Sequence, residues 1–183
     1  MRTPLRTVVL GTAALAVAGT VTAVTFNASA AETSATARPR PSASTVASPI
    51  DPPAGKRWLG TYKVVSGTQT YTCANGSFAG ASVPEAQLVG TGGRLHHFKG
   101  PSWQSTRDKS LVTAAKVGER ARTGTIAELL LEVNSHTGPA NGVLGKATHI
   151  QRLGTSGGVA PTRACTDGQT TAVRYGATYV FWG

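Results

Sequence analysis

The 183-residue sequence lacks the residue patterns that most often indicate a reaction or a bound metal. It has only two cysteines, and it contains none of the CxxC, HExxH or HxH spacings that would support a metal site. No long apolar run follows residue 24, which excludes a chain with several membrane-spanning helices. We therefore predict no catalytic residue, no metal and no cofactor, and the chain is more readily interpreted as a binding protein than as an enzyme.

Acidic residues are also scarce, with 8 Asp and Glu against 18 Lys and Arg. Fourteen of the basic and six of the acidic side chains fall within residues 56–183. A positive field favours polyanions, so an extracellular or cell-wall anionic polymer is the first candidate partner. The alternative is that the charge only keeps an exported protein soluble. Nucleic acid is a weaker candidate, because no nucleic-acid fold motif or array of stacking aromatic residues is present.

The first thirty residues have the order of a secretory signal peptide. Arg2 and Arg6 precede an apolar run over 8–24, and Ala28-Ser29-Ala30 supplies the small residues of a cleavage site. We expect cleavage after Ala30 and a secreted product without a membrane span; the alternative is that the run remains as an anchor. Residues 31–55, rich in Ala, Ser, Thr and Pro, are predicted to be a disordered linker.

Residues 56–183 are long enough to form one secreted domain. Cys73 and Cys165 both lie in this segment, and export would place them in an oxidising compartment. We predict that they form a disulfide, which would close a loop of about ninety residues. The alternative is a catalytic thiol, but neither cysteine has an adjacent base apart from Asp167.

Short runs rich in β-branched and aromatic residues alternate with turn dipeptides across the domain. We predict strands over residues 58–65, 68–72, 94–98, 111–117, 147–153 and 172–182. Residues 126–133 fit helical and strand spacings alike, and we favour a strand. The predicted fold is all-β, an antiparallel sandwich or barrel of roughly seven to eight short strands with one disulfide.

The segment from His96 to Trp103 holds the densest group of unusual side chains. Adjacent residues of a strand face opposite sides, so we expect one of His96 and His97 in the core and the other in solvent. Trp103 is expected to fill the core. The alternative is that Trp103 lines a cleft with His97, Gln151 and Arg152, where aromatic and polar groups would hold a sugar or another small polar ligand.

Arg152 lies in an otherwise apolar strand. A buried guanidinium needs a partner, because an unpaired buried charge is very costly. We therefore expect an ion pair with one of three acids: Asp108, Glu128 or Glu132. The alternative is that Arg152 offers a planar clamp for a carboxylate or phosphate ligand.

Residues 154–158 read Gly-Thr-Ser-Gly-Gly and match the G-x-S-x-G pattern of serine hydrolases. That motif requires a helix directly after the serine. Pro161 follows instead, with no apolar helical face, so we predict a glycine-rich loop rather than a nucleophile.

Several short segments occur in a fixed order along residues 59–182. They are GTQTYTC (67–73), HFKGPSW (97–103), IQR (150–152), TSGGVAP (155–161), Cys165 and YGATYVF (175–181). The ordered set resembles the secreted domain-of-unknown-function family 3455 of bacteria and fungi. Its members usually continue the Trp103 segment into Asp-Gly-Ser, where this chain has Asp108-Lys109-Ser110. The resemblance implies secretion and a β-rich fold, and it implies no activity.

Two functions therefore remain open. The first is a non-catalytic module that binds an anionic polymer through its basic residues. The second is an enzyme or small-molecule-binding protein whose cleft is formed by the His97/Trp103 and Gln151/Arg152 segments. The sequence makes no prediction of the oligomeric state.

Overall fold

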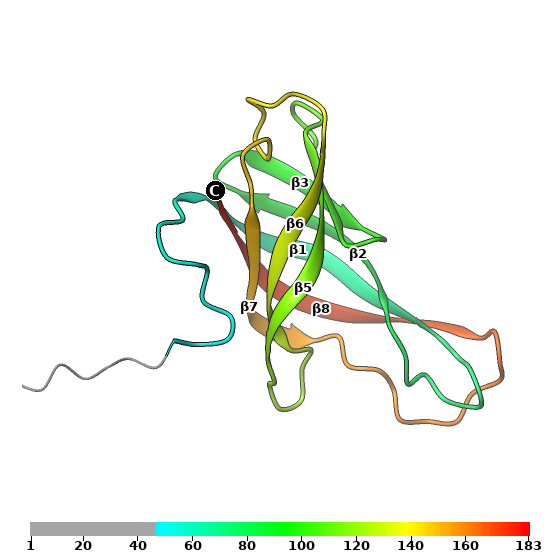
Figure 1. Ribbon diagram of the computed structural model, residues 1–183. Helices are drawn as coiled ribbons and strands as arrows, with labels where there is room; N and C mark the ends of the chain where they lie inside the picture. The colour runs from blue at the N-terminus through cyan, green and yellow to red at the C-terminus, as the bar shows by residue number, and fades with distance from the viewer. Residues whose placement is uncertain (1–46) are drawn as a thin grey trace, which may run out of the picture. The chain divides into compact units, whose positions relative to one another are not determined.

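The computed structural model describes residues 47–183, which form a closed barrel of eight antiparallel strands (Figure 1). Each strand pairs with the next one in sequence, and the last strand pairs with the first. The strands are β1 (Trp58–Thr72), β2 (Val83–Gly90), β3 (Gly93–Phe98), β4 (Ser102–Ser105), β5 (Leu111–Arg120), β6 (Glu128–Thr137), β7 (His149–Gly157) and β8 (Thr170–Trp182). The all-β antiparallel prediction is confirmed, and the barrel is the architecture formed. The predicted signal peptide and the linker up to residue 46 lie outside the described residues.

Three strands differ from the predicted runs in more than the residues at which they begin or end. Residues 58–65 and 68–72 form one strand, β1, because a bulge between Val64 and Ser66 carries the pairing across the expected break. Strands β2 and β4 match no predicted run, since β2 contains Pro84 and β4 is only four residues long. The ambiguous segment around residue 130 is a strand, β6. In the described part of the chain, no helix is long and apolar enough to cross a membrane.

Side chains alternate between the barrel interior and its outer surface. In β8, Tyr175, Ala177, Tyr179 and Phe181 are buried, while the residues between them are only partly covered. The interior is filled mainly by aliphatic and aromatic side chains, among them Leu88, Leu95, Val112, Leu131, Ile150 and Phe181. Side chains therefore fill most of the barrel interior, and only a small cavity is left.

One end of the barrel is sealed by the loop between β6 and β7. Leu144 and Ala147 of this loop are buried in the main core. Asp108, in the β4–β5 loop, accepts hydrogen bonds from the Val143 backbone N–H at 2.7 Å and from the Ser110 hydroxyl at 2.7 Å. These bonds connect the two loops, so this end is closed.

At the other end, β1 and β8 run on together to two long loops (Figure 1). The predicted disulfide between Cys73 and Cys165 is confirmed, with 6.1 Å between the two Cα atoms. It links the loop that follows β1 to the loop that precedes β8. Tyr71, Cys73 and Phe78 form a second, smaller core beside it.

Residues 48–51, which we call the strap, pack on the outer surface of the barrel. Ile50 is 2% exposed, and its backbone oxygen accepts a hydrogen bond from Gln151 Nε2 of β7 at 2.6 Å. The strap also lies over Gly118 of β5. These residues belong to the segment that the sequence predicted as linker, and here they are part of the folded unit.

Candidate functional site

A cavity of about 110 Å³ lies inside the barrel. Its lining comes from seven of the eight strands and from two adjoining loops. The polar and aromatic lining residues are Gln69, Ser82, His97, Trp103, Arg152 and Tyr179; the others are Pro84, Pro101, Leu129 and Leu131. Three of the four residues predicted for a cleft, His97, Trp103 and Arg152, therefore line one cavity. The fourth, Gln151, does not.

Strand register brings the cavity side chains together. His97 of β3 lies directly opposite Trp103 of β4, and their rings stack with centroids 4.2 Å apart and planes inclined by 6°. Arg152 of β7 lies opposite Tyr179 of β8. The Tyr179 ring is 5.3 Å from the His97 ring and 5.6 Å from the Trp103 ring. Tyr179 therefore connects the stacked pair to the wall that carries Arg152.

Gln151 faces the outside of the barrel because it is adjacent to the inward-facing Arg152 in a strand. Its amide nitrogen donates to the Ile50 oxygen of the strap, and its amide oxygen accepts from Trp182 Nε1 at 2.8 Å. Both polar atoms of Gln151 are thus used to attach the strap and to order Trp182. Gln151 therefore has a structural role on the outside of the barrel.

His97 is neutral at physiological pH. Burial lowers the pKa of its imidazole to about 4, and the positive charge of Arg152 acts in the same direction. Its Nδ1 donates a hydrogen bond to the Ser102 backbone oxygen at 2.8 Å, so Nε2 carries a lone pair and can accept. The neighbouring His96 faces outward and pairs with Glu85. As expected for adjacent strand residues, one histidine lies in the core and the other near solvent.

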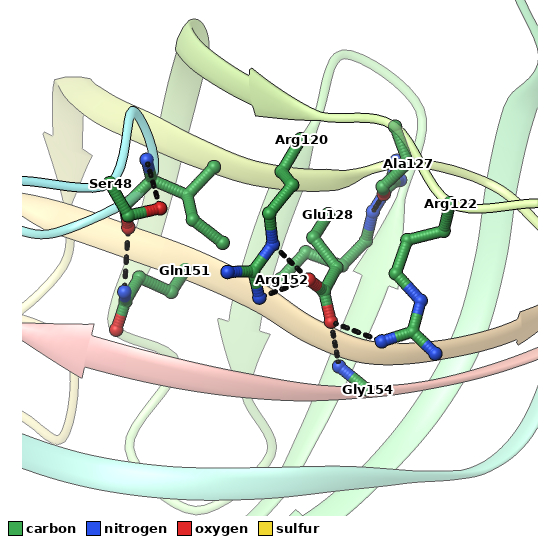
Figure 2. A network of polar contacts seen from close by, with 9 residues as sticks. Ser48, Arg120, Arg122, Ala127, Glu128, Gln151, Arg152 and Gly154 are labelled. Carbon is green, nitrogen blue, oxygen red and sulfur yellow. Dashed lines mark hydrogen bonds and ion pairs between the residues drawn. The ribbon is translucent and has the colours of Figure 1, made fainter.

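Arg152 is held by a backbone oxygen rather than by an acid. Its Nε and Nη2 both donate to the Ala127 oxygen, at 3.0 and 2.8 Å (Figure 2). Leu129 is the β6 residue opposite Arg152, so the adjacent Glu128 faces the other side of the sheet. The predicted ion pair of Arg152 with Asp108, Glu128 or Glu132 is therefore wrong.

Glu128 is the centre of a separate ionic cluster, shown in Figure 2 between Arg120 and Arg122. Its carboxylate accepts from Arg120 Nε at 2.8 Å, from Arg122 Nη1 at 3.2 Å and from the Gly154 backbone N–H at 2.7 Å. Burial alone would raise the pKa of Glu128, but the Arg120 and Gly154 hydrogen bonds and the two positive charges lower it below its usual value. Glu128 is thus an ionised structural residue.

Asp108 is likewise occupied, at the opposite end of the barrel. The Ser110 hydroxyl and the backbone N–H groups of Val143 and Ser110 lower its pKa well below the usual range, although burial acts against them. Because Asp108 and Glu128 lie at opposite ends of β5, the two acid–base candidates of the sequence do not converge on one site.

The sequence interpretation missed three polar residues of the cavity: Gln69, Ser82 and Tyr179. The Ser82 hydroxyl donates to Gln69 Oε1 at 2.6 Å, and Gln69 is 3% exposed. Gln69 lies two residues from the buried Tyr71 in an alternating strand, and Tyr179 falls on the apolar face of β8. The alternation of these two strands could therefore have predicted that Gln69 and Tyr179 face the interior. Nothing in the sequence places the loop residue Ser82 at the cavity.

Neither the serine-hydrolase pattern nor a group of metal ligands forms a site in the described structure. The Gly-Thr-Ser-Gly pattern forms the irregular end of β7 rather than a loop, with Ser156 exposed and no helix after it. Among residues 47–183, no three His, Cys, Asp or Glu side chains come close enough together to hold a metal ion.

Comparison with known proteins gives one match. The family model described as "Protein of unknown function (DUF3455)" matches residues 86–183. The matched region includes His97, Trp103 and Arg152 but not Gln69 or Ser82. Neither the curated proteins nor the solved structures contain a match.

Proposed function

This chain belongs to the DUF3455 family, and because the function of that family is unknown, we propose a function from the cavity itself: the barrel binds a small organic molecule. The observation that carries the proposal is the convergence of His97, Trp103 and Arg152, from three strands, on one interior space. Eight-stranded barrels have an interior that side chains fill or that holds one small ligand.

The cavity has the mixed lining that ligand sites share. Leu129, Leu131 and two prolines give it an apolar surface, while Arg152 and Gln69 supply hydrogen-bond donors. Its volume of about 110 Å³ is smaller than the roughly 300–1,000 Å³ of drug-sized pockets. The site therefore suits a single ring, a short branched chain, or one end of a longer molecule.

Binding fits the site better than catalysis does. A general acid–base reaction needs a proton-transfer group with a pKa near the working pH. His97 titrates near pH 4, and Asp108 and Glu128 are bound elsewhere in the fold. The lining residues are therefore better suited to bind a molecule in one orientation than to transfer a proton.

Titration with small probes tests the proposal. Benzamide, benzoate, isobutyramide and isobutyrate are added to ¹⁵N-labelled protein, and we expect at least one of them to shift the Trp103 indole and Arg152 amide resonances saturably. Leu129→Trp fills the cavity and should abolish these shifts. Leu153→Trp places the same ring on the neighbouring strand outside the cavity and should not. Absence of saturable shifts with all four probes would reject the proposal.

Anionic polymer binding is a second candidate, supported by unbalanced basic residues. Three of the fourteen basic side chains of residues 56–183, Lys116, Arg120 and Arg122, form ion pairs with acids in the described structure. The others, apart from Arg152 in the cavity, leave a positive surface that would attract a polyanion. Retention on isolated cell-wall material should fall steeply as salt is raised, because screening weakens contacts between exposed charges. Retention independent of salt would exclude this mechanism.

We also propose that the protein is exported from the cytoplasm. A disulfide between Cys73 and Cys165 is typical of proteins that fold in an oxidising compartment, and the sequence carries a signal-like leader. Mass spectrometry of the extracellular product should give an N-terminus at Ala31. An intact N-terminus on cell-associated protein would contradict the proposal.

A further inference from the structure

We infer that the ligand of the barrel cavity is a small monocarboxylate, whose carboxylate binds Arg152 and whose hydrocarbon part lies against the apolar side chains of the lining. The inference rests on the proposed ligand-binding function and adds the chemical class of the ligand. Three features support it: the charge of the lining, its unpaired donors, and its size.

The lining carries one positive charge and no negative charge. Arg152 is the charged member of the lining, and no carboxylate is among the residues that surround the cavity in the described structure. Two acids adjoin lining residues in sequence, and both are already paired: Glu128, next to Leu129, binds Arg120, Arg122 and the Gly154 N–H, and Glu85, next to Pro84, binds His96. The cavity therefore lacks an internal counter-ion for Arg152, and an anionic ligand would supply one.

The guanidinium of Arg152 is positioned to accept such a ligand. Its Nε and Nη2 are fixed on the Ala127 oxygen, which orients the plane, and the Tyr179 hydroxyl is a second neighbour of the guanidinium. Of the five guanidinium N–H groups, these two contacts leave at least two for a further acceptor. A guanidinium bonds the two oxygens of a carboxylate in one plane. Because His97 is neutral, the cavity provides one unit of positive charge, which matches a monoanion rather than a dianion.

The other polar side chains of the lining offer one acceptor and one donor. Trp103 Nε1 is buried without a partner and has no surface open to the cavity, whereas the neutral His97 offers Nε2 as an acceptor. The Gln69 oxygen already accepts from Ser82, so that side chain presents its amide nitrogen, a donor, to any further partner. The remaining N–H groups of Arg152 and Gln69 outnumber this acceptor, which favours a ligand that brings several lone pairs, as a carboxylate does.

The size of the cavity restricts the remainder of the ligand. About 110 Å³ accommodates a group somewhat smaller than the benzene that fills a 150 Å³ engineered cavity. Leu129, Leu131 and Pro101 give that space an apolar boundary. A branched short-chain acid fits it, and a ring acid fits only if part of its ring lies outside this space.

The test compares charged and neutral ligands of the same shape. Isobutyrate and benzoate are titrated against isobutyramide and benzamide at pH 7 by calorimetry and by the Trp103 indole resonance. We expect each carboxylate to bind about tenfold more tightly than its amide, because a charge-assisted hydrogen bond is worth roughly one factor of ten or more. Equal affinity within a pair, or tighter binding of the amide, overturns the inference.

Variants assign the preference to Arg152. Arg152→Gln should remove the carboxylate preference while leaving amide affinity within about twofold, and Arg152→Lys should retain part of it. Arg94→Gln removes one exposed positive charge outside the cavity and should leave the preference unchanged. A preference that survives Arg152→Gln in folded protein rejects the role of Arg152.

If Arg152→Gln does not fold, the wild-type comparison of carboxylate with amide still decides the inference. If neither carboxylate nor amide binds, the proposed function itself fails, which is a different outcome from binding without charge preference.

Discussion

The carbonyl oxygen of Pro49 lies directly on Gly118, so close that a β-carbon at residue 118 would come within 1.9 Å of it. Glycine at this position of β5 is what allows the strap to lie flat on the barrel. Opposite Gly118, Leu130 of β6 is buried although it faces outward. The strap thus extends the core to the outer surface of the sheet.

Gly118→Ala should therefore displace the strap. Since the clash is with backbone atoms, which cannot move aside locally, we expect the free energy of unfolding to fall by about 1–3 kcal/mol. Hydrogen exchange at the backbone amides of Ser48, Ile50 and Asp51 should become fast. Gly80→Ala is the matched control, because no atom lies within 4 Å of a β-carbon there. Unchanged exchange in Gly118→Ala would show that the strap tolerates the added carbon.

Lys109→Gly should stabilise the protein. Lys109 has a φ of 61°, a left-handed conformation that costs a residue with a β-carbon about 1–2 kcal/mol. Members of the family usually carry glycine at this position, between Asp and Ser, and glycine would remove this conformational cost. Part of the benefit is lost because glycine is more flexible in the unfolded chain, so we expect the free energy of unfolding to rise by about 1 kcal/mol. Urea unfolding measures the gain. Lys109→Ala keeps the β-carbon and should show none; an equal gain in both would assign the effect to the lysine side chain.

The stability of the protein should decrease between about pH 6.5 and pH 4. His97 has a folded pKa of about 4 against 6.5 for the free group, so the unfolded chain binds a proton first as the pH falls. The linked loss is about 3 kcal/mol at most once the pH is below both values. His97→Phe should reduce this dependence, leaving the part due to His149, whose pKa burial also lowers, and, close to pH 4, the onset of the part due to Glu128, whose pKa, despite burial, is lowered by Arg120 and Gly154. An NMR titration of the His97 ring with a midpoint near 6.5 would contradict the assignment.

Removing the disulfide should cost roughly 4 kcal/mol of unfolding free energy, because it closes a long loop of the unfolded chain. Cys73 and Cys165 are 92 residues apart. The double variant Cys73→Ser/Cys165→Ser and the reduced wild-type protein should lose the same amount in denaturant titrations, with reductant having no effect on the variant. Equal stability of oxidised and reduced protein would show that the barrel alone determines the transition.

Period-two alternation predicted much of this fold. The pattern of residues 172–182 predicted the strand β8, and the presence of Cys73 and Cys165 as the two cysteines of a chain with a signal-like leader indicated their pairing. The irregularities were not predictable, because a bulge such as that at Val64 and Ser66 depends on the partner strands rather than on local composition.

The candidate site was predicted only in part, for a related reason. Alternation shows that Gln151 and Arg152 face opposite sides, but it does not show which side is interior when both are covered. Gln151 is 6% exposed on the outside because the strap covers it. The partner of Arg152 was missed because a backbone oxygen, that of Ala127, has no signature in the sequence.

The pairing of the first strand with the last also sets an order for folding. One edge of β1 has no partner until β8 has been made, and more than a hundred residues separate the backbone atoms of Arg57 and Gly183 that bond across this seam. Closure therefore depends on contacts remote in sequence, which form slowly. Until then an unpaired strand edge is exposed to other chains, so aggregation during refolding should compete with closure and should ease as the protein is diluted.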